Sequence, residues 1–443
     1  MQRGAGWLER AGLGRPELRA WALYDWANSA FFTTVVTAVF PIYYREVAAA
    51  GEEGVLEGYS ALTTWAMVAI ALVGPVLGAL SDTRLRKKTL MAAFVVLGVS
   101  ATAALWFVER GDWRFASLCF VLGNIGVAGS FLFYDALLPA VAREEELDRV
   151  STAAYALGYL GGGVLLAANL AWILKPEWFG MESGSTLPVR LAFLSVAAWW
   201  ALFALPLFLR VKEPPRAYES DERPGGSLVR DAFARLGETL REIPRYRDAF
   251  LLLLAMLAYN DGINTIIRLA TIYGAEIGLG AKEMIPAILL VQFVGVPCAF
   301  GFGWLARRVG PKRAVVGGVL VYIGITALAW RMASPDETHK VELFYVLAIG
   351  VALVMGGCQA LTRSMFASMV PAHKAGEFFG LFGVLERFSA ILGPLCFGLA
   401  ISWTGEQRAG VVPLFGFFAL GALLLSKVDL ERGRRVAREA SSR

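Results

Sequence analysis

Long apolar runs recur along this chain of 443 residues, and they limit its fold more than any other feature. A helix needs about 20 mostly apolar residues to cross the roughly 30 Å of hydrocarbon in a bilayer. Hydrophobic residues make up 57% of the chain and charged residues 18%, which is more apolar than one globular core requires. The sequence therefore predicts an all-α polytopic membrane protein and excludes a disordered chain or a single soluble domain.

Twelve of these runs fit a transmembrane helix. They cover approximately Arg19–Tyr44, Tyr59–Leu80, Thr89–Val108, Trp113–Leu138, Ser151–Leu174, Pro188–Leu209, Phe250–Ala275, Lys282–Ala306, Arg313–Met332, Leu343–Phe366, Glu377–Trp403 and Gly410–Ser426. We expect no large domain outside the membrane, because these spans use most of the chain. The N-terminal segment has no short apolar stretch followed by a small-residue cleavage site, so no cleaved signal peptide is predicted.

The basic residues indicate the orientation. Lys and Arg concentrate in the N-terminal tail, in alternate loops such as 84–88 and 307–313, in the central loop and in the C-terminal tail. Because cytoplasmic loops carry this excess, we expect an inner (plasma) membrane protein with both termini in the cytoplasm. The net charge of +5 is small, and the basic residues flank the spans. They favour contact with anionic lipid headgroups over nucleic acid.

The central segment divides the spans into two sets of six. It holds Pro214, Pro215 and Pro224 among mixed charges, and it leads into a predicted interfacial helix, Val229–Ile243. We expect a cytoplasmic segment (1–18), an N-terminal six-helix bundle (19–209), a cytoplasmic linker with this interfacial helix (210–248), a C-terminal six-helix bundle (249–427) and a basic cytoplasmic tail (428–443).

Two short patterns occur once in each half. The sequence from Gly78 to Lys88 and that from Gly303 to Arg313 both read G-x-L-small before a basic turn, and Asp25–Ser29 and Asp261–Thr265 both read D-x-x-N-[S/T]. Two pseudo-symmetric six-helix halves are typical of a rocker-type secondary transporter, with its site where the halves meet. Topology alone also permits another large polytopic protein, such as an integral-membrane enzyme or a scramblase.

Ionisable residues inside the spans are costly in lipid and mark candidate sites. Asp261 lies about 16 Å into its predicted span, near the midplane. Asn264, Thr265 and Arg268 follow it on the same face, so the four form one polar ridge. This ridge predicts a substrate or proton site, and the alternative is an ion pair that fixes helix packing.

The first span carries a similar group. Tyr24, Asp25 and Asn28 cluster on one face, but Asp25 lies only about 9 Å into the predicted span. The sequence leaves open whether Asp25 lines the substrate cavity or a gate.

Other polar residues complete the predicted sites. Glu386 and Arg387 lie in the middle of the eleventh span, and Gln359 is a candidate neutral lining residue. Candidates for a cytoplasmic gate lie near span ends and in the two basic turns; they are Asp82, Arg86, Lys87, Asp135, Arg307 and Arg363.

Two family resemblances follow from these residues. Gly78, Leu80, Ser81 and Asp82, with Arg86–Lys88, resemble the loop signature between helices two and three of the major facilitator superfamily. Leu85 stands where that pattern usually has Gly, and the second copy has Arg307 in place of Asp. Several strings also resemble the autophagy-related vacuolar amino-acid effluxer family and its bacterial relatives. These strings are Trp21–Ser29, Phe133–Pro139, Ala156–Gly162, Tyr259–Gly262 and Glu377–Leu381. The resemblance implies a twelve-helix facilitator fold and efflux of amino acids.

We therefore expect a monomeric secondary active transporter of a small metabolite, with an amino acid as the leading candidate. Arg268 would bind a carboxylate, while Asp261 would take an ammonium group or a coupling proton. The alternatives are an exporter of drugs or lipid-like amphiphiles, and a nutrient sensor or scaffold that moves nothing. No cofactor is expected apart from a proton as a candidate coupling ion. The two histidines and four cysteines are scattered, which predicts neither a metal site nor an enzyme.

Overall fold

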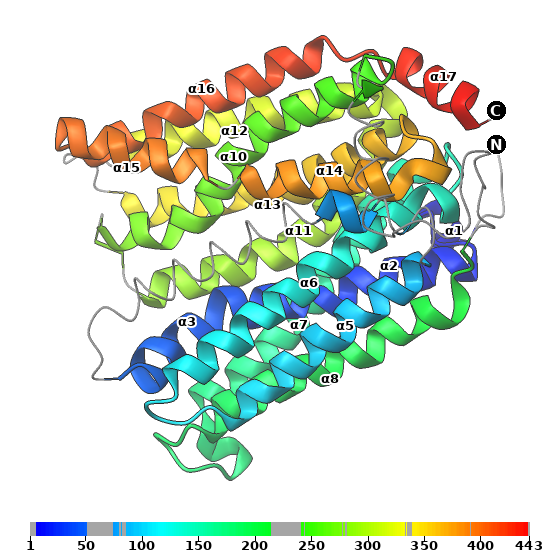
Figure 1. Cartoon of the computed structure of the whole chain (residues 1–443). Helices are drawn as coiled ribbons and strands as arrows, with labels where there is room; N and C mark the ends of the chain where they lie inside the picture. The colour runs from blue at the N-terminus through cyan, green and yellow to red at the C-terminus, as the bar shows by residue number, and fades with distance from the viewer. Residues whose placement is uncertain are drawn as a thin grey trace.

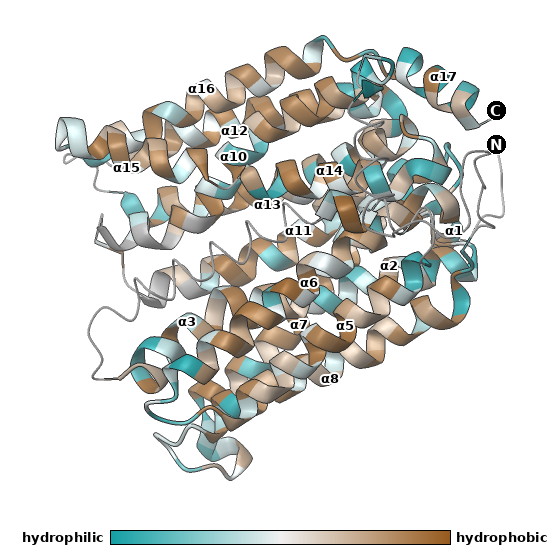
Figure 2. Ribbon diagram, in the orientation of Figure 1, coloured by the Kyte–Doolittle hydropathy of each residue, from teal (hydrophilic) through white to brown (hydrophobic). Residues whose placement is uncertain are grey.

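The computed structural model describes residues 6–50, 74–78, 81, 86–213, 241–242, 244–276, 278–279, 281–332, 334, 339–389 and 391–441. Long helices account for most of these residues, as the apolar runs predict (Figure 1). Apolar side chains cover much of their length, and polar residues collect towards the helix ends (Figure 2). The predicted interfacial helix at 229–243 and most of the predicted second span lie outside the described residues.

The N-terminal helices begin with a short helix, α1 (Trp7–Arg10). The first span then runs without a break through α2 (Pro16–Ala30), the π-helical η1 (Phe31–Val39), α3 (Phe40–Tyr43) and η2 (Tyr44–Ala48). The others are α5 (Lys87–Ala104), which ends in a 3₁₀ turn at Leu105–Phe107, and α6 (Trp113–Val141), α7 (Leu147–Leu174) and α8 (Leu187–Arg210).

The C-terminal helices are α10 (Arg247–Glu276), α11 (Ala281–Val309), α12 (Pro311–Met332), α13 (Lys340–Ser368), α14 (Ala375–Phe388), α15 (Leu392–Thr404) and α16 (Gln407–Ser426). A further polar helix, α17 (Leu430–Ser441), follows the last span. The predicted eleventh span is thus built from α14 and α15. Helix α14 ends at Phe388, and Gly393 and Pro394 lie in the first turn of α15, where the missing N–H of a proline breaks no bond within the helix.

Ten helical stretches of the described residues are long and apolar enough to cross a membrane. The continuous first span from Pro16 to Ala48 adds to them, because its separate segments are each too short to be counted. The chain is therefore a multi-pass membrane protein, as predicted.

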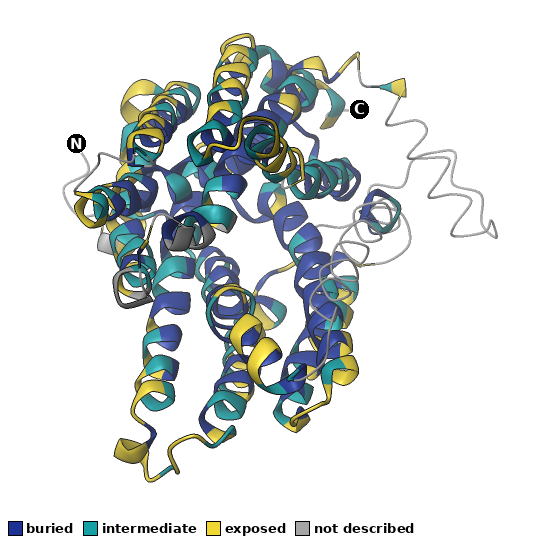
Figure 3. Ribbon diagram, turned by 90° about the vertical axis from the view of Figure 1, so that its left-hand side faces the viewer, coloured by how far each residue is buried: buried dark blue, intermediate teal, exposed yellow. Residues whose placement is uncertain are grey.

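The helices form two bundles with the termini at one end, which we call the terminal end (Figure 1). In the N-terminal bundle α2 packs on α7 and α8, and α5 packs on α6; in the C-terminal bundle α10 and α12 pack on α16. Across the interface α7 packs on α11 and α13, and α6 packs on α14. Buried residues follow the inner faces of the helices and exposed ones the rim (Figure 3). The interface between the bundles therefore contains buried side chains from both.

Candidate functional site

A buried arginine joins the two bundles. The side chain of Arg363, on α13, is 3% exposed and forms ion pairs with two aspartates of the N-terminal bundle. Its Nη2 lies 3.2 Å from Oδ2 of Asp25 on α2, and its Nη1 lies 3.1 Å from Oδ1 of Asp135 on α6. These carboxylates are 7% and 11% exposed, so water screens the pairs weakly. One cation of the C-terminal bundle thus holds two anions of the other.

Further groups of the N-terminal bundle enclose this guanidinium. Its Nε donates a hydrogen bond to Oγ of Ser151 at 2.9 Å, and Nη2 donates to the main-chain oxygen of Ser151 at 3.3 Å. The ring centroids of Trp21, Tyr134 and Tyr155 lie 4.9, 5.4 and 4.6 Å from Cζ of Arg363. Aromatic faces attract a cation by about 0.5–2 kcal/mol each, so the surroundings favour a planar positive group.

Two residues of the first span, one helical turn apart, contact α6 and hold the Asp25 carboxylate in place. Trp21 and Asp25 point to the same side of α2 because they are four residues apart. Nε1 of Trp21 donates to the main-chain oxygen of Tyr134 at 3.0 Å, and the two rings stack with centroids 4.4 Å apart. The hydroxyl of Tyr134 in turn donates to Oδ2 of Asp25 at 3.0 Å. Helices α2 and α6 therefore orient the Asp25 carboxylate on their own.

Two charges of α14 lie beside this group. Glu386 is half-buried and interacts electrostatically with Arg363 and Asp135. Arg387 donates from Nη2 to the main-chain oxygen of Ala128 on α6 at 2.9 Å, which is another contact across the interface. We call Asp25, Asp135, Arg363, Glu386 and Arg387 the central charge cluster. With every group ionised, its three carboxylates and two guanidiniums leave one excess negative charge.

The polar ridge of α10 faces its own bundle. Oδ1 of Asp261 accepts a hydrogen bond from the main-chain nitrogen of Gly393 at 2.7 Å, near the first residue of α15. Nδ2 of Asn264 donates to Oγ of Ser389 at 3.2 Å, and Oγ1 of Thr265 donates to the main-chain oxygen of Asp261 at 2.7 Å. The ridge thus supplies partners for the break between α14 and α15, where helix ends leave main-chain groups unsatisfied. The side chain of Arg268 is not among the described parts of the structure.

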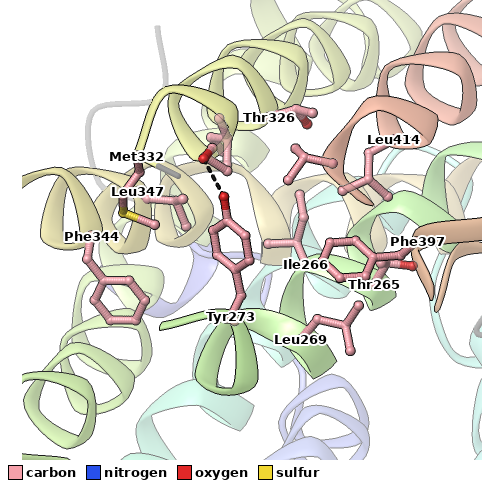
Figure 4. Close-up of a pocket in the computed structure, with 14 residues that line it drawn as sticks. Thr265, Ile266, Leu269, Tyr273, Thr326, Met332, Phe344, Leu347, Phe397 and Leu414 are labelled. Carbon is pink, nitrogen blue, oxygen red and sulfur yellow. Dashed lines mark hydrogen bonds between the residues drawn. The ribbon is translucent and has the colours of Figure 1, made fainter. Parts of the chain in front are cut away.

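A small cavity lies beside this ridge, with Thr265 in its wall (Figure 4). Its volume is about 40 Å³, and its lining is almost entirely apolar, with side chains such as Ile266, Leu269, Phe344 and Phe397. The hydroxyl of Tyr273 is turned to the main-chain oxygen of Ala329 at 2.7 Å. A space of this size and character is a packing void of the C-terminal bundle rather than a substrate chamber.

The remaining predicted residues lie apart from the central charge cluster or at its margin. Asp82 lies outside the described residues. Tyr24 and Asn28 are buried, Gln359 is half-buried, Arg86 is exposed just before α5, Lys87 is buried in the first turn of α5, and Arg307 is exposed near the end of α11. Of the predicted gate residues, the structure brings Asp135 and Arg363 together.

Backbone contacts bring the bundles together near the terminal end. A Cβ atom on Gly78 would lie 2.1 Å from the main-chain oxygen of Gly376, and one on Gly380 would lie 2.7 Å from Cα of Pro75. Here the segment 74–78 meets α14 so closely that a side chain on either glycine would clash.

Polar contacts reinforce this end. Oγ of Ser364 on α13 donates to Oδ1 of Asp148 on α7 at 2.5 Å. Nη2 of Arg438 on α17 lies 2.9 Å from Oε1 of Glu144, in the turn between α6 and α7. The structure therefore holds the terminal end closed.

Comparison with known proteins identifies the family. The model of the family described as "Vacuole effluxer Atg22 like" matches residues 59–438, which is most of the chain. The chain belongs to the Atg22-like family. The resemblance to this family is thereby confirmed, and four of its five strings lie within the matched residues.

Relatives of the chain occur in bacteria and fungi. The MFS-type transporter YxiO of Bacillus subtilis (strain 168) is 35% identical over 425 residues, covering 95% of this chain and 96% of that protein. Autophagy-related protein 22 of Cryptococcus neoformans var. neoformans serotype D (strain JEC21) is 26% identical over 309 residues, covering 67% of this chain and 53% of that protein. The chain thus spans almost the whole bacterial relative and about half of this fungal one.

Solved structures share the fold of this Atg22-like chain. FucP in the outward conformation matches with a TM-score of 0.69 at 13% identity, covering 95% of this chain and 99% of that one. A bacterial homologue of the iron transporter ferroportin, in an outward-facing state, matches with a TM-score of 0.64 at 16% identity, covering 97% and 100%. The Atg22-like chain therefore has the major facilitator fold. The description of its family and the name of its 35% identical relative both indicate a transporter.

Four partners of Arg363 in this Atg22-like chain were absent from the predicted site. Trp21 and Tyr134 lie within the strings that resemble the family, so a signal for them existed. Ser151 and Tyr155 had none, because a serine and a tyrosine in an apolar helix carry no charge that demands a partner.

Proposed function

We propose that this protein carries an amino acid across the inner (plasma) membrane by alternating access, as a secondary active transporter whose termini lie in the cytoplasm. The observation that supports the mechanism is the Arg363 guanidinium shared by Asp25 and Asp135 across the bundle interface. Membership of the Atg22-like family, whose description reads vacuole effluxer, supports efflux as the direction. The amino acid as cargo rests on the family resemblance of the sequence strings given above.

The central charge cluster acts as the gate of the terminal end in this proposal. Asp25 lies about 13 Å beyond the first residue of α2, and Arg363 about 8 Å before the last residue of α13, at 1.5 Å per residue. Opening the terminal end separates these helices and exposes the cluster to water. The ion pairs therefore exist in the state closed at this end and are replaced by hydration in the other, which gives two alternating arrangements.

Charge balance links the gate to a driving ion. The cluster carries one excess negative charge when all its groups are ionised, and a buried excess charge is costly. A proton on Glu386, or the ammonium group of a bound amino acid, would neutralise it. We propose Glu386 as the proton-coupling residue because it is half-buried on α14 next to Arg387, which contacts α6 across the interface. The prediction that Arg268 and Asp261 bind the substrate remains open to test on the same preparation.

The test is transport by purified protein in proteoliposomes. Radiolabelled amino acids are offered singly, with and without a pH gradient, and amphiphilic drugs are added as competitors. We expect uphill movement of at least one amino acid that collapses with the gradient. In the Glu386→Gln variant, exchange should persist while uphill accumulation is lost, because the carboxyl that takes up the proton is gone.

Other outcomes contradict parts of the proposal. Flux of amphiphiles with no amino-acid flux would assign the fold to export of lipid-like compounds. Binding without any flux would indicate a sensor. Unchanged uphill transport in Glu386→Gln would remove that residue from coupling.

A further inference from the structure

A second group of charges lies at the terminal end, on the outside of the interface. Three arginines, Arg10, Arg149 and Arg307, line one small surface depression. The other lining residues are Ala11, Thr152, Phe300, Gly303 and Trp304, so no acidic side chain lines it. Arg10 and Arg149 belong to the N-terminal part of the chain and Arg307 to the C-terminal bundle. We call this feature the arginine depression.

A sharp turn places Arg10 beside Arg149. Helix α1 ends at Arg10, and Gly12 follows with a φ of +82°, a conformation that side chains disfavour. A Cβ atom on Gly12 would lie 2.8 Å from Cβ of Arg149, so the turn rests directly on the first turn of α7. The backbone thus fixes two guanidinium-bearing segments against each other.

A second close approach brings Arg307 to the same place. A Cβ atom on Gly303 would lie 2.4 Å from Oγ1 of Thr152, so α11 and α7 nearly touch here. Arg307 comes one helical turn after Gly303 and therefore lies on the same face of α11. Two glycines, one on each side, allow this gathering of positive charge.

The three arginines contrast with their neighbours. Arg15 pairs with Glu146 at 2.6 Å and Arg438 pairs with Glu144 at 2.9 Å at this same end. Within the described part of the chain, no ion pair is found for the arginines of the depression, and Nε of Arg149 is buried without a hydrogen-bond partner. Like charges that converge without an anion repel one another, so the depression is complementary to a negative ligand.

We propose that the arginine depression binds a phosphate group and that the bound phosphate bridges the two bundles. Guanidinium forks match phosphate oxygens in geometry and donate charge-assisted hydrogen bonds. Arg149 lies in the first turn of α7 and Arg307 in the last turn of α11, which places both where spans end and lipid headgroups begin. Two sources share this chemistry, an anionic phospholipid headgroup and a free phosphate. This role is distinct from the gate role that the sequence predicted for Arg307, and it does not depend on which solute the protein transports.

The test is native mass spectrometry of the detergent-purified full chain, titrated with phosphatidylglycerol, phosphatidylcholine or inorganic phosphate. We expect phosphatidylglycerol to bind more tightly than phosphatidylcholine, whose positive headgroup amine opposes the arginines. Arg149→Gln and Arg307→Gln should each weaken binding about 5-fold, the typical contribution of one basic residue near an anionic surface. Arg313→Gln is the control, because Arg313 is exposed at the same end and does not line the depression.

Both arms of the titration can decide the proposal. Binding of inorganic phosphate that displaces phosphatidylglycerol and falls in the two variants would support a free phosphate as the ligand. Lipid binding that falls in the variants, with no effect of inorganic phosphate, would support a headgroup. Equal retention of both lipids, or equal losses in Arg313→Gln and the depression variants, would overturn the proposal. Thermal unfolding of each variant without added ligand separates loss of binding from loss of fold.

Discussion

The same five-residue string, D-x-x-N-[S/T], has different surroundings in the two halves. Its first copy starts at Asp25, whose carboxylate pairs with Arg363 of the opposite bundle at 3.2 Å. Its second copy starts at Asp261, whose carboxylate accepts a hydrogen bond from Gly393 of the same bundle at 2.7 Å. Both aspartates are buried. The repeat therefore conserves a polar helix face but not what that face contacts.

The two contacts should behave differently when the protein changes state. A contact across the interface changes when the bundles move, whereas a contact within one bundle persists in every state. We therefore propose a gating role for Asp25 and a role in holding the break between α14 and α15 for Asp261. The predictions below test the closure of the terminal end, and one of them compares the two copies directly.

The largest effect is expected from Arg363→Ala. Removing one partner of a buried ion pair costs about 3–5 kcal/mol, because the remaining charges stay buried and unpaired. The terminal end should therefore lose its closed state. Spin labels on Glu145→Cys and Arg313→Cys, exposed on opposite bundles, should show a longer distance than in the parent protein. Arg363→Lys should give a partial change, and an unchanged distance in Arg363→Ala would contradict the gate.

Gly78→Ala should also open this end. The new methyl group would meet the main-chain oxygen of Gly376, which cannot turn aside as a side chain can. Overpacking of this kind costs about 1–3 kcal/mol, and here it destabilises only the closed state. The same label distance measures it. Gly317→Ala is the matched control, since no atom lies within 4 Å of its added Cβ; a similar response of both variants would refute the close approach.

The two aspartates should respond differently to an asparagine. Asp25→Asn removes a charge that faces Arg363, and a hydrogen bond to a charged group contributes about 1.5–3 kcal/mol. Asp261→Asn keeps an oxygen that can accept from Gly393, so its effect on the label distances should be smaller than that of Asp25→Asn. For both variants, the free energy of unfolding in denaturant and the distance between the spin labels are measured. A loss of proton-driven accumulation in Asp261→Asn alone would instead assign coupling to α10.

The smallest effect is expected from Glu144→Ala. Its pair with Arg438 is exposed, with side chains 36% and 64% accessible, and such pairs contribute about 0.2–1 kcal/mol. Label distances should shift slightly at low salt and not at high salt. Arg438→Ala should give a smaller shift than Glu144→Ala, because it leaves the pair of Glu144 with Arg434 at 3.5 Å in place. A large salt-independent change would show that α17 contributes more than these pairs.

The spans could be predicted because each depends on local composition. The apolar run from Trp113 predicts α6, whereas the run Glu377–Trp403 predicts one span where the structure has α14 and α15. Asp25, Asp135 and Arg363 were each noticed because a charge inside an apolar helix needs a partner. Their pairing could not be predicted, because Arg363 and Asp25 are 338 residues apart and nothing local encodes a contact across bundles. Asp261 shows a second limit, because the sequence predicts a buried carboxylate there but not its hydrogen bond with Gly393 of α15.

The choice of arginine at position 363 has a consequence for control. A guanidinium keeps its proton at every pH that a cell meets, so this base cannot be switched off by titration. Only the acids around it can change their charge, and only mechanical separation or a competing cation can release them. With a lysine or histidine at this position, both the base and the acids of the cluster could change their charge with pH. With arginine, only the carboxylates can.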